Sequence, residues 1–352
     1  MTETKLCLRT APPIAVTMGE PAGIGGEIAL LAWQRRDRDG LNPFFLLDDP
    51  ARLTALAKRL DLAVPVREIV AADKAHEIFG QALPVLPIGG LGQPPCPGAP
   101  DPSHGGAILA SIERATALAR SGEAAAVVTN PIHKQVLRQA GFNHPGHTEY
   151  LAALTECTTP PVMMLVCSTL RVVPVTVHLG LAEAIATLTT EAIVEKATIT
   201  VQALRTDFGV PEPRVAVAAL NPHAGEGGLM GCEEIEVIAP AIDILRTRGL
   251  DVSGPSPADT LFHAAARTRY DAAICMYHDQ ALVPLKTIDF EGGVNVTLGL
   301  PIVRTSPDHG TAFDIAGTGR ASPASLIAAI ALAADMSRQR HRASRAESAD
   351  ES

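Results

Sequence analysis

Short apolar runs alternate with longer amphipathic segments along most of the chain. Apolar runs with the composition of β-strands lie at 13–18, 124–129, 171–178, 215–220 and 271–277. Helical spacing follows between them, most clearly over 103–120, 190–208 and 233–248, where Ser103 and Thr190 or Glu191 are predicted N-terminal caps and Gly209 and Gly249 mark two of the ends. This alternation predicts repeated strand–helix–strand units. Several strands are almost wholly apolar, which is typical of sheets covered on both faces.

The length of 352 residues exceeds what one hydrophobic core usually organises, so two domains are expected. We predict an α/β fold of two α/β/α domains with a cleft between them: residues 12–130 plus 286–336 form a discontinuous domain on the cofactor side, and residues 131–285 form a domain on the metal and dimer-interface side. Residues 84–102 concentrate proline and glycine, which predicts a surface loop or a crossing between units. Residues 337–352 are polar and charged, which predicts a disordered tail.

Composition narrows the classes of function. A net charge of −9 and an aromatic content of 3% argue against nucleic-acid binding. No apolar stretch approaches the length of a membrane span and the N-terminus has no apolar signal core, so a cytoplasmic location is expected. The six cysteines form no CxxC pair and are expected to be buried thiols in a reducing compartment; they are Cys7, Cys96, Cys157, Cys167, Cys232 and Cys275.

Three apolar runs end in or next to a histidine, at His178, His223 and His278. In open α/β sheets, ligands bind outside the carboxyl ends of the strands. A single histidine in such a place is usually structural, but three of the chain's 11 histidines at equivalent strand ends favour a metal site. Three imidazoles and a vacant position are the arrangement of a catalytic divalent ion. The spacings match no local zinc motif, so convergence in space remains open at this point.

Other polar residues stand out in apolar or glycine-rich surroundings. The segments 18–27 (MGEPAGIGGE) and 221–228 (NPHAGEGG) are turns that could hold an anion or could be plain connections, and the first does not spell GxGxxG. In GHTE (146–149), His147 and Thr148 could bind a phosphate or carboxylate, or Thr148 could cap a helix. Lys286, Asn295 and Arg304 lie in a region poor in charge, where a cation needs an anion.

Two carboxylates lie near these motifs. Asp259 could complement a helix dipole, which is the role we favour, and Asp279 could orient His278 or bind the metal. Asp259, Asp279 and Lys286 are therefore candidates for the general base, and the sequence does not choose among them.

The motifs GEPAGIGGE, PGHTE, NPHAGEGG, PADT, MYHDQ, NVTLGLP and RTSPDHGTAFDIAG together resemble the 4-hydroxythreonine-4-phosphate dehydrogenase family, from about residue 13 to 336. The resemblance implies an isocitrate/isopropylmalate dehydrogenase-like fold and a homodimer, with an active site in the cleft between domains that is shared across the dimer interface. It implies three sets of residues: metal ligands His178, His223 and His278; substrate-binding His147, Thr148, Lys286, Asn295 and Arg304; and cofactor-binding His309, Gly310 and Asp314. Two positions depart from the family pattern, Gly26 and Gly180 standing where proline is usual.

The family implies oxidation of 4-phosphohydroxy-L-threonine with NAD or NADP and one divalent ion per site, zinc, magnesium or cobalt. The keto acid formed, 2-amino-3-oxo-4-(phosphonooxy)butanoate, would lose carbon dioxide to give 3-amino-2-oxopropyl phosphate on the route to pyridoxal phosphate. One alternative is a dehydrogenase of D-threonate or D-erythronate 4-phosphate. More distant alternatives are a phosphate acetyltransferase-like acyltransferase and a binding protein without catalysis. No nucleic-acid or membrane partner is expected.

Overall fold

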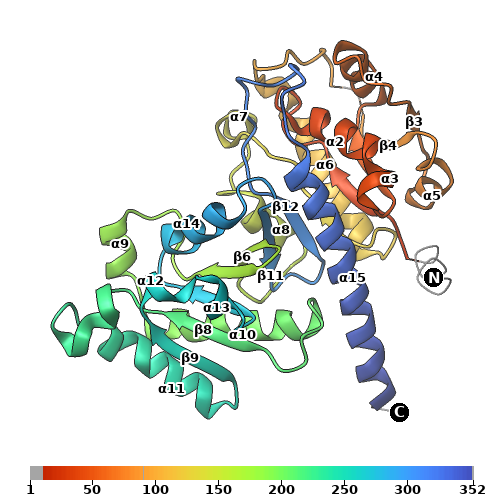
Figure 1. The fold of residues 1–352 in the computed structure, drawn as a ribbon. Coiled ribbons are helices and arrows are strands. Elements are labelled where there is room, and N and C mark those ends of the chain that lie inside the picture. The colour runs from red at the N-terminus through yellow and green to blue at the C-terminus, as the bar shows by residue number, and fades with distance from the viewer. Residues whose placement is uncertain (1–10, 90, 351–352) are drawn as a thin grey trace. The chain divides into compact units, whose positions relative to one another are not determined.

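The computed structural model describes residues 11–89 and 91–350, which form two compact units (Figure 1). Unit 1 contains the described residues up to Pro161 together with Leu300–Arg338. Unit 2 contains Val162–Gly299 and the described residues from Gln339 onward. The domains predicted from the sequence change at 130 and 285, whereas the units change at 161 and 299. The assignment of a cofactor side and a metal side to them stays a prediction.

Unit 1 is built on a parallel sheet with the strand order β3-β4-β2-β1-β5-β12. The strands are β1 (Ile14–Thr17), β2 (Phe44–Asp48), β3 (Val66–Glu68), β4 (Leu83–Pro87), β5 (Val127–Val128) and β12 (Arg304–Pro307). Every residue of β1, β2 and β12 is buried. Sheets covered on both faces require this, and it explains the continuous apolar runs in the sequence.

Helices follow the strands of unit 1 in the expected alternation. They are α2 (Gly25–Gln34), α3 (Arg36–Asp39), α4 (Pro50–Arg59), α5 (Ala75–Ile78), α6 (Gly105–Arg120), α7 (Lys134–Gln139), α8 (His147–Leu154) and α15 (Ala324–Asp350), with 3-10 turns at Ala72–Lys74 and Pro102–His104. Helix α6 packs on β1 and β2, where Ile108 and Ile112 are fully buried. Because the strands of this sheet are parallel, the chain segments that leave β1, β2, β4 and β12 emerge at one edge of the sheet.

Unit 2 has a mixed sheet with the order β11-β6-β7-β10-β8-β9. The strands are β6 (Val162–Cys167), β7 (Leu170–Pro174), β8 (Arg214–Ala218), β9 (Asp251–Ser256), β10 (Ala272–Cys275) and β11 (Val294–Leu298). Strand β6 is antiparallel to both β7 and β11, while β7, β10, β8 and β9 are parallel to one another. The parallel part places the carboxyl ends of β7, β8 and β10 at one edge.

The helices of unit 2 are α9 (Leu181–Ala186), α10 (Thr190–Thr206), α11 (Ala239–Thr247), α12 (Ala258–Leu261), α13 (Ala264–Arg267) and α14 (His278–Ile288). Pro222–Gly228 forms a tight turn, and a π-helical turn, η4 (Glu234–Ile238), precedes α11. Helix α10 packs against α11, and α14 packs on β6, β7 and β10. A compact apolar core that includes Leu165, Val172, Ala273 and Leu285 lies beneath α14.

Some local expectations need correction. Ser103 is not the cap before α6, because Asp101 accepts a hydrogen bond from the Ser103 amide and a 3-10 turn intervenes. Instead of a disordered tail from residue 337, α15 continues through residue 350. Within unit 2, Arg340 of this helix forms an ion pair with Asp207, with Nη2 2.6 Å from Oδ2. A long-range ion pair of this kind leaves no local signal in the sequence.

The expectation that the cysteines are buried is only partly met. Cys167 and Cys275 are buried and Cys157 is half-buried, but Cys96 and Cys232 are exposed because each lies in an irregular loop. Cys7 lies outside the described residues. None of the helices described here combines the length and the apolar content needed to cross a membrane.

Candidate functional site

The three histidines singled out in the sequence all lie at one edge of the unit 2 sheet. His178 follows β7, His223 follows β8, and His278 is the first residue of α14 after β10. Because β7, β10 and β8 are parallel neighbours, the segments that leave their carboxyl ends emerge together. The strands stop three to five residues before each histidine, so these side chains lie on connecting segments and not on the strands themselves.

Two of these imidazoles are brought together within unit 2. The ring centroids of His178 and His278 are 5.7 Å apart, with the ring planes tilted by 42°. Nδ1 of His278 is 2.8 Å from Oδ1 of Asp279, which fixes the ring and leaves Nε2 pointing elsewhere. An imidazole whose second nitrogen is held by a carboxylate is the usual arrangement around a metal ligand.

His223 lies on a turn with unusual backbone geometry. Five consecutive residues, 223 to 227, have left-handed φ angles of 51°, 54°, 74°, 44° and 69°. His178 also has a positive φ, of 54°. For a residue with a side chain this conformation costs about 1–2 kcal/mol, so His223, Ala224 and Glu226 together carry roughly 3–6 kcal/mol of strain. Strain of this kind concentrates at ligand-binding sites. Within the described part of the chain, no three His, Cys, Asp or Glu side chains are grouped closely enough to hold an ion.

Two of the three candidate acid–base groups of unit 2 line a depression of about 510 Å3. Asp259, in the first turn of α12, and Asp279 both line it, together with Tyr277 and His263. Lys286, in the last turn of α14, places its Nζ 5.3 Å from the centroid of the Phe290 ring. Asn295 lies in β11, and its Oδ1 is buried without a hydrogen-bond partner. Asp279 thus contacts His278 and Asp259 lines the same depression, while Lys286 lies farther along the helix that begins with His278 and Asn295 lies in β11.

Unit 1 contains a buried cation next to a buried imidazole. Arg304 is 4% exposed in β12, and its Nε and Nη2 donate to Oγ1 of Thr129 at 3.2 Å and 2.6 Å. Burial lowers the pKa of Arg304 to about 10, and the Glu149 carboxylate opposes that shift. The guanidinium therefore stays charged at neutral pH and favours an anion nearby.

His147 is the first residue of α8, followed by the half-buried Thr148. His147 as a whole is partly exposed, yet its Nε2 is buried and has no hydrogen-bond partner. Desolvation, and then the positive charges of Arg304 and Lys134, hold the pKa of His147 well below the usual 6.5. The imidazole is therefore neutral at physiological pH. A buried neutral ring nitrogen beside a guanidinium is suited to hydrogen bonding with an oxyanion or hydroxyl.

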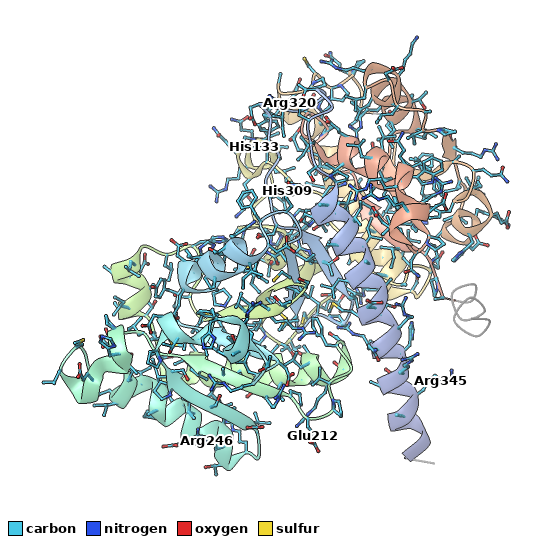
Figure 2. The ribbon with its side chains drawn as sticks, viewed as in Figure 1. His133, Glu212, Arg246, His309, Arg320 and Arg345 are labelled. Carbon is cyan, nitrogen blue, oxygen red and sulfur yellow. The ribbon has the colours of Figure 1, made fainter. Side chains whose placement is uncertain are left out.

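The predicted cofactor residues lie on the loop that leaves β12. His309, Gly310 and Asp314 belong to this loop of unit 1, where Nδ1 of His309 is 3.1 Å from the Gly310 carbonyl oxygen and Asp314 is exposed. Figure 2 marks His309 and His133. His133 packs edge-on against Phe313 of the same loop, with ring centroids 5.1 Å apart.

The 18–27 segment anchors this loop, an arrangement that sequence reasoning missed. Glu27 is fully buried, and its carboxylate accepts hydrogen bonds from the amides of Gly317 at 2.8 Å and Ala321 at 3.3 Å. The amide of Ile24 donates to the Thr311 carbonyl oxygen at 3.1 Å. The available signal was the presence of two glutamates, Glu20 and Glu27, in an otherwise apolar glycine-rich stretch, because a buried carboxylate needs donors.

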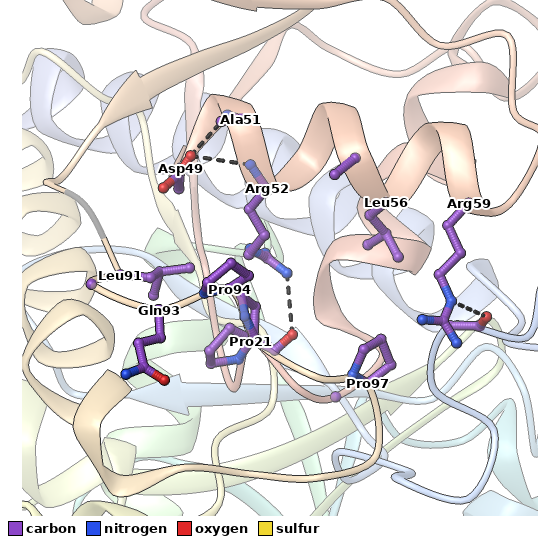
Figure 3. A pocket seen from close by; sticks show the side chains of 15 residues that line it. Pro21, Asp49, Ala51, Arg52, Leu56, Arg59, Leu91, Gln93, Pro94 and Pro97 are labelled. Atoms are coloured by element: carbon purple, nitrogen blue, oxygen red, sulfur yellow. Dashed lines mark hydrogen bonds between the residues drawn. The ribbon is translucent and has the colours of Figure 1, made fainter.

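A cavity of about 480 Å3 opens beside these segments (Figure 3). Proline and leucine side chains form much of its wall, including Pro21, Pro97 and Leu91. Arg52 and Arg59 bring two guanidiniums to it: Arg52 donates to the Pro21 carbonyl oxygen at 3.3 Å and Arg59 to that of Gly317 at 3.2 Å (Figure 3). The cavity has the size and the mixed lining of a small-molecule site.

A second buried polar group near this edge was also missed. Glu20 is 1% exposed and its Oε2 has no hydrogen-bond partner. Burial raises its pKa, against the lowering effects of the Ala22 amide, His104, His133 and Arg52. Polar residues so far apart in the sequence give no spacing pattern that would have revealed them.

Comparison with known proteins decides the family. The family model described as "Pyridoxal phosphate biosynthetic protein PdxA" matches residues 41–333. The 4-hydroxythreonine-4-phosphate dehydrogenase of Methylorubrum extorquens is 56% identical over 326 residues, covering 91% of this chain and 93% of that protein. The enzyme of the same name from Caulobacter vibrioides is 54% identical over 336 residues, covering 94% and 99%.

This chain belongs to the PdxA family. The crystal structure of the 4-hydroxythreonine-4-phosphate dehydrogenase from Klebsiella pneumoniae, a protein with 38% identity, matches it with a TM-score of 0.83 and covers 93% of this chain and 98% of that one. The recognition made from the motifs and the α/β fold class are thereby confirmed. The PdxA family matches place the chain among oxidoreductases of pyridoxal phosphate biosynthesis.

Proposed function

We propose that this member of the PdxA family oxidises 4-phosphohydroxy-L-threonine at carbon 3 with NAD or NADP. The product, 2-amino-3-oxo-4-(phosphonooxy)butanoate, then loses carbon dioxide and becomes 3-amino-2-oxopropyl phosphate. The relatives from Methylorubrum extorquens and Caulobacter vibrioides, which cover 91% and 94% of the chain, carry the name of this enzyme. The observation that carries the proposal to this chain's own residues is the pairing of His178 with His278, whose second ring nitrogen Asp279 holds.

We propose that His178, His223 and His278 hold one divalent ion, zinc, cobalt or magnesium. Neutral imidazoles are the donors that zinc and cobalt prefer, and a ring fixed through Nδ1 fits a ligand at Nε2. Such an ion, when bound, would supply Lewis-acid chemistry at the substrate oxygen, and a nicotinamide would accept the hydride. Asp259 and Asp279, which line one depression, and Lys286 are the candidates for accepting the hydroxyl proton.

Five residues are the proposed substrate ligands. In unit 1, the buried charge of Arg304 would attract the phosphate or carboxylate, and neutral His147 with Thr148 would hydrogen-bond to the same end of the substrate. In unit 2, Lys286 and Asn295 would add a second cation and an amide. Fixing both charged ends of the substrate would limit the orientations of carbon 3.

We propose that the dinucleotide binds at the loop that contains His309, Gly310 and Asp314. The anchoring of this loop by Glu27, and the cavity beside Arg59 and Gly317, support a binding role for this edge of the unit 1 sheet. Gly310 has open space on its side-chain face, where a ligand could approach the backbone closely. The choice between NAD and NADP is left to measurement.

We further propose a cytoplasmic homodimer with the active site shared between subunits. Large apolar side chains are exposed on unit 2, a feature typical of protein interfaces. They lie on and next to α9, the 223–231 turn and α14, and include Leu181 (59%), Leu229 (84%), Ile235 (54%), Val283 (62%) and Phe290 (76%). Sedimentation of the purified protein would show the dimer.

A spectrophotometric assay of nicotinamide reduction tests the proposed reaction. The wild-type protein should reduce NAD or NADP with 4-phosphohydroxy-L-threonine, lose this activity with a chelator, and regain it when zinc or cobalt is added. His178→Ala should be inactive, while His341→Ala, which removes an exposed imidazole elsewhere in unit 2, should behave like the wild type. Full turnover in the presence of the chelator would contradict the metal proposal.

The same assay separates the alternative substrates. A terephthalate 1,2-cis-dihydrodiol dehydrogenase from Burkholderia xenovorans matches this chain with 31% identity and a TM-score of 0.61, so the scaffold accommodates different substrates. D-threonate and D-erythronate 4-phosphate are therefore included. Faster reduction with either acid would replace the proposed substrate. A branched-chain phosphotransacylase from Enterococcus faecalis, with 10% identity and a TM-score of 0.53, shares only the fold.

A further inference from the structure

A lysine ammonium lies at the N-terminal end of helix α8, and the reaction proposed above gives it no role. Gly146 precedes this helix, and no side chain caps it. A Cβ built on Gly146 would lie 3.4 Å from Cε and 3.5 Å from Nζ of Lys134, the first residue of α7. The ammonium of Lys134 therefore lies beside the start of α8, where His147 and Thr148 form the first turn.

This position is electrostatically unfavourable for a cation unless an anion joins it. The N-terminal end of a helix is itself positive, so the Lys134 ammonium opposes the dipole of α8. The charge of Lys134 and that of the buried Arg304 act on the same imidazole, because both lower the pKa of His147. Among the described residues, none forms a hydrogen bond or an ion pair with Nζ of Lys134. An anion held between the two cations would remove their repulsion.

One carboxylate lies near these cations without compensating both of them. Oε2 of Glu149 is 3.4 Å from the same Cβ position on Gly146. Its charge acts on Arg304, where it opposes the effect of burial on the pKa of the guanidinium. Glu149 is exposed, so solvent and salt screen its charge more than they screen the charge of the buried Arg304. The surroundings of His147 therefore stay positive.

His147 itself has a ring nitrogen that is available to such an anion. Its Nε2 is buried without a hydrogen-bond partner. Because the pKa of His147 is held well below 6.5, the ring is neutral and has one N–H and one lone pair. A phosphate monoester, with a second pKa of about 6, has a charge near −2 at pH 7 and three acceptor oxygens. It can compensate both cations and also accept from the imidazole, whereas a carboxylate compensates only one cation.

We propose that Lys134 is a further substrate-binding residue, and that Lys134, Arg304 and His147 receive the phosphate group of the substrate and not its carboxylate. This inference deepens the proposed function and rests on the phosphorylated substrate named there. Lys134 supplies the second charge that a dianion needs. The amides in the first turn of α8 would donate to the same oxygens, as helix N-termini commonly do for phosphates.

Binding of inorganic phosphate to the full chain tests the proposal without using catalysis. The imidazole NMR signal of His147, identified by its loss in His147→Gln, reports binding at this place. Lys134→Gln should weaken phosphate binding about fivefold, the upper end of what an exposed charge contributes to an ion pair. The same variant should raise the pKa of His147, because a repelling charge is removed. Lys134→Arg keeps the charge and should retain most of the affinity.

Arg138→Gln is the matched control for the loss of charge. It removes an exposed cation from the same helix, one turn beyond Lys134, and should leave the phosphate dissociation constant within about twofold. Acetate tests the choice of anion: at the concentration at which phosphate shifts the His147 signal, acetate should shift it little. Acetate that binds as tightly as phosphate, and is weakened equally by Lys134→Gln, would overturn the assignment of the phosphate group.

Kinetics with two substrates separate this inference from the function on which it rests. Lys134→Gln should raise KM for 4-phosphohydroxy-L-threonine about fivefold with little change in kcat, and should leave kcat/KM for unphosphorylated 4-hydroxy-L-threonine as in the wild type. Equal losses with both substrates, or wild-type phosphate affinity in Lys134→Gln, would overturn the proposal. Phosphate binding that Lys134→Gln weakens, in a protein that reduces no nicotinamide, would support the phosphate site and contradict the proposed reaction.

Discussion

The hydroxyl of Thr129 stabilises the buried charge of Arg304, and Thr129→Val removes it while keeping the shape of the side chain. Both groups are almost fully buried, at 1% and 4% exposed, and one oxygen accepts from Nε and Nη2. Hydrogen bonds to charged groups contribute about 1.5–3 kcal/mol. We therefore expect Thr129→Val to lower the free energy of unfolding of unit 1 by about 1.5–3 kcal/mol.

Urea unfolding followed by tryptophan fluorescence measures this loss in the right unit. The chain has a single tryptophan, Trp33, which is 4% exposed in α2 of unit 1. Thr116→Val is the matched control, because its buried hydroxyl donates only to the Ile112 carbonyl oxygen within α6, and its loss should cost about 1 kcal/mol or less. Equal destabilisation by the two variants would refute the reasoning.

Three further predictions concern the 308–317 loop, the pH dependence of stability, and Gly26, which stands where the family usually has proline. Glu27→Gln should weaken NAD(P) binding about tenfold, since it removes the charge that accepts hydrogen bonds from the Gly317 amide at the end of the 308–317 loop and from the Ala321 amide just beyond it, and such bonds contribute about 1.5–3 kcal/mol; calorimetry that finds wild-type affinity would contradict the anchoring role. His147 has a lowered folded pKa, so the unfolded chain binds the proton first and stability should fall as pH drops below about 6.5. His147→Gln should reduce that acid sensitivity in urea titrations, and an unchanged pH profile would count against it. Gly26→Pro should destabilise unit 1 by roughly 1–3 kcal/mol in Trp33-monitored melts, because a Cβ there lies 3.0 Å from the Arg52 guanidinium nitrogens. A stabilised variant would show that Arg52 moves aside freely.

The sequence predicted which segments lie at the edges of the sheets better than it predicted the local backbone conformation. Apolar runs before His178, His223 and His278 correctly indicated strands, and parallel pairing explains why the following segments share an edge. The left-handed φ angles at His178 and His223 were not predictable, because apart from nearby glycines the sequence around them has no residue pattern that indicates this conformation. Hydrophobic periodicity records which face is buried and carries no information about such dihedral angles.

The buried polar contacts were also beyond the reach of sequence patterns. Glu27 binds amides near residue 317, and Arg340 pairs with Asp207, so each contact joins segments far apart in the chain. The second contact pairs a residue of the segment that has the composition of a tail with a buried carboxylate. Polar composition alone does not reveal a partner that only the fold brings near.

The left-handed backbone at His178 and His223 restricts which residues could replace these two histidines over evolutionary time. With φ of 54° and 51°, both positions exclude β-branched residues and disfavour most others, while asparagine and aspartate tolerate the conformation. Cysteine and glutamate, the other common ligands of transition metals, would add backbone strain. For the proposed metal site, the accessible exchange would therefore run from nitrogen to oxygen donors, and a lineage that left imidazole at these positions would move toward harder cations such as magnesium or manganese.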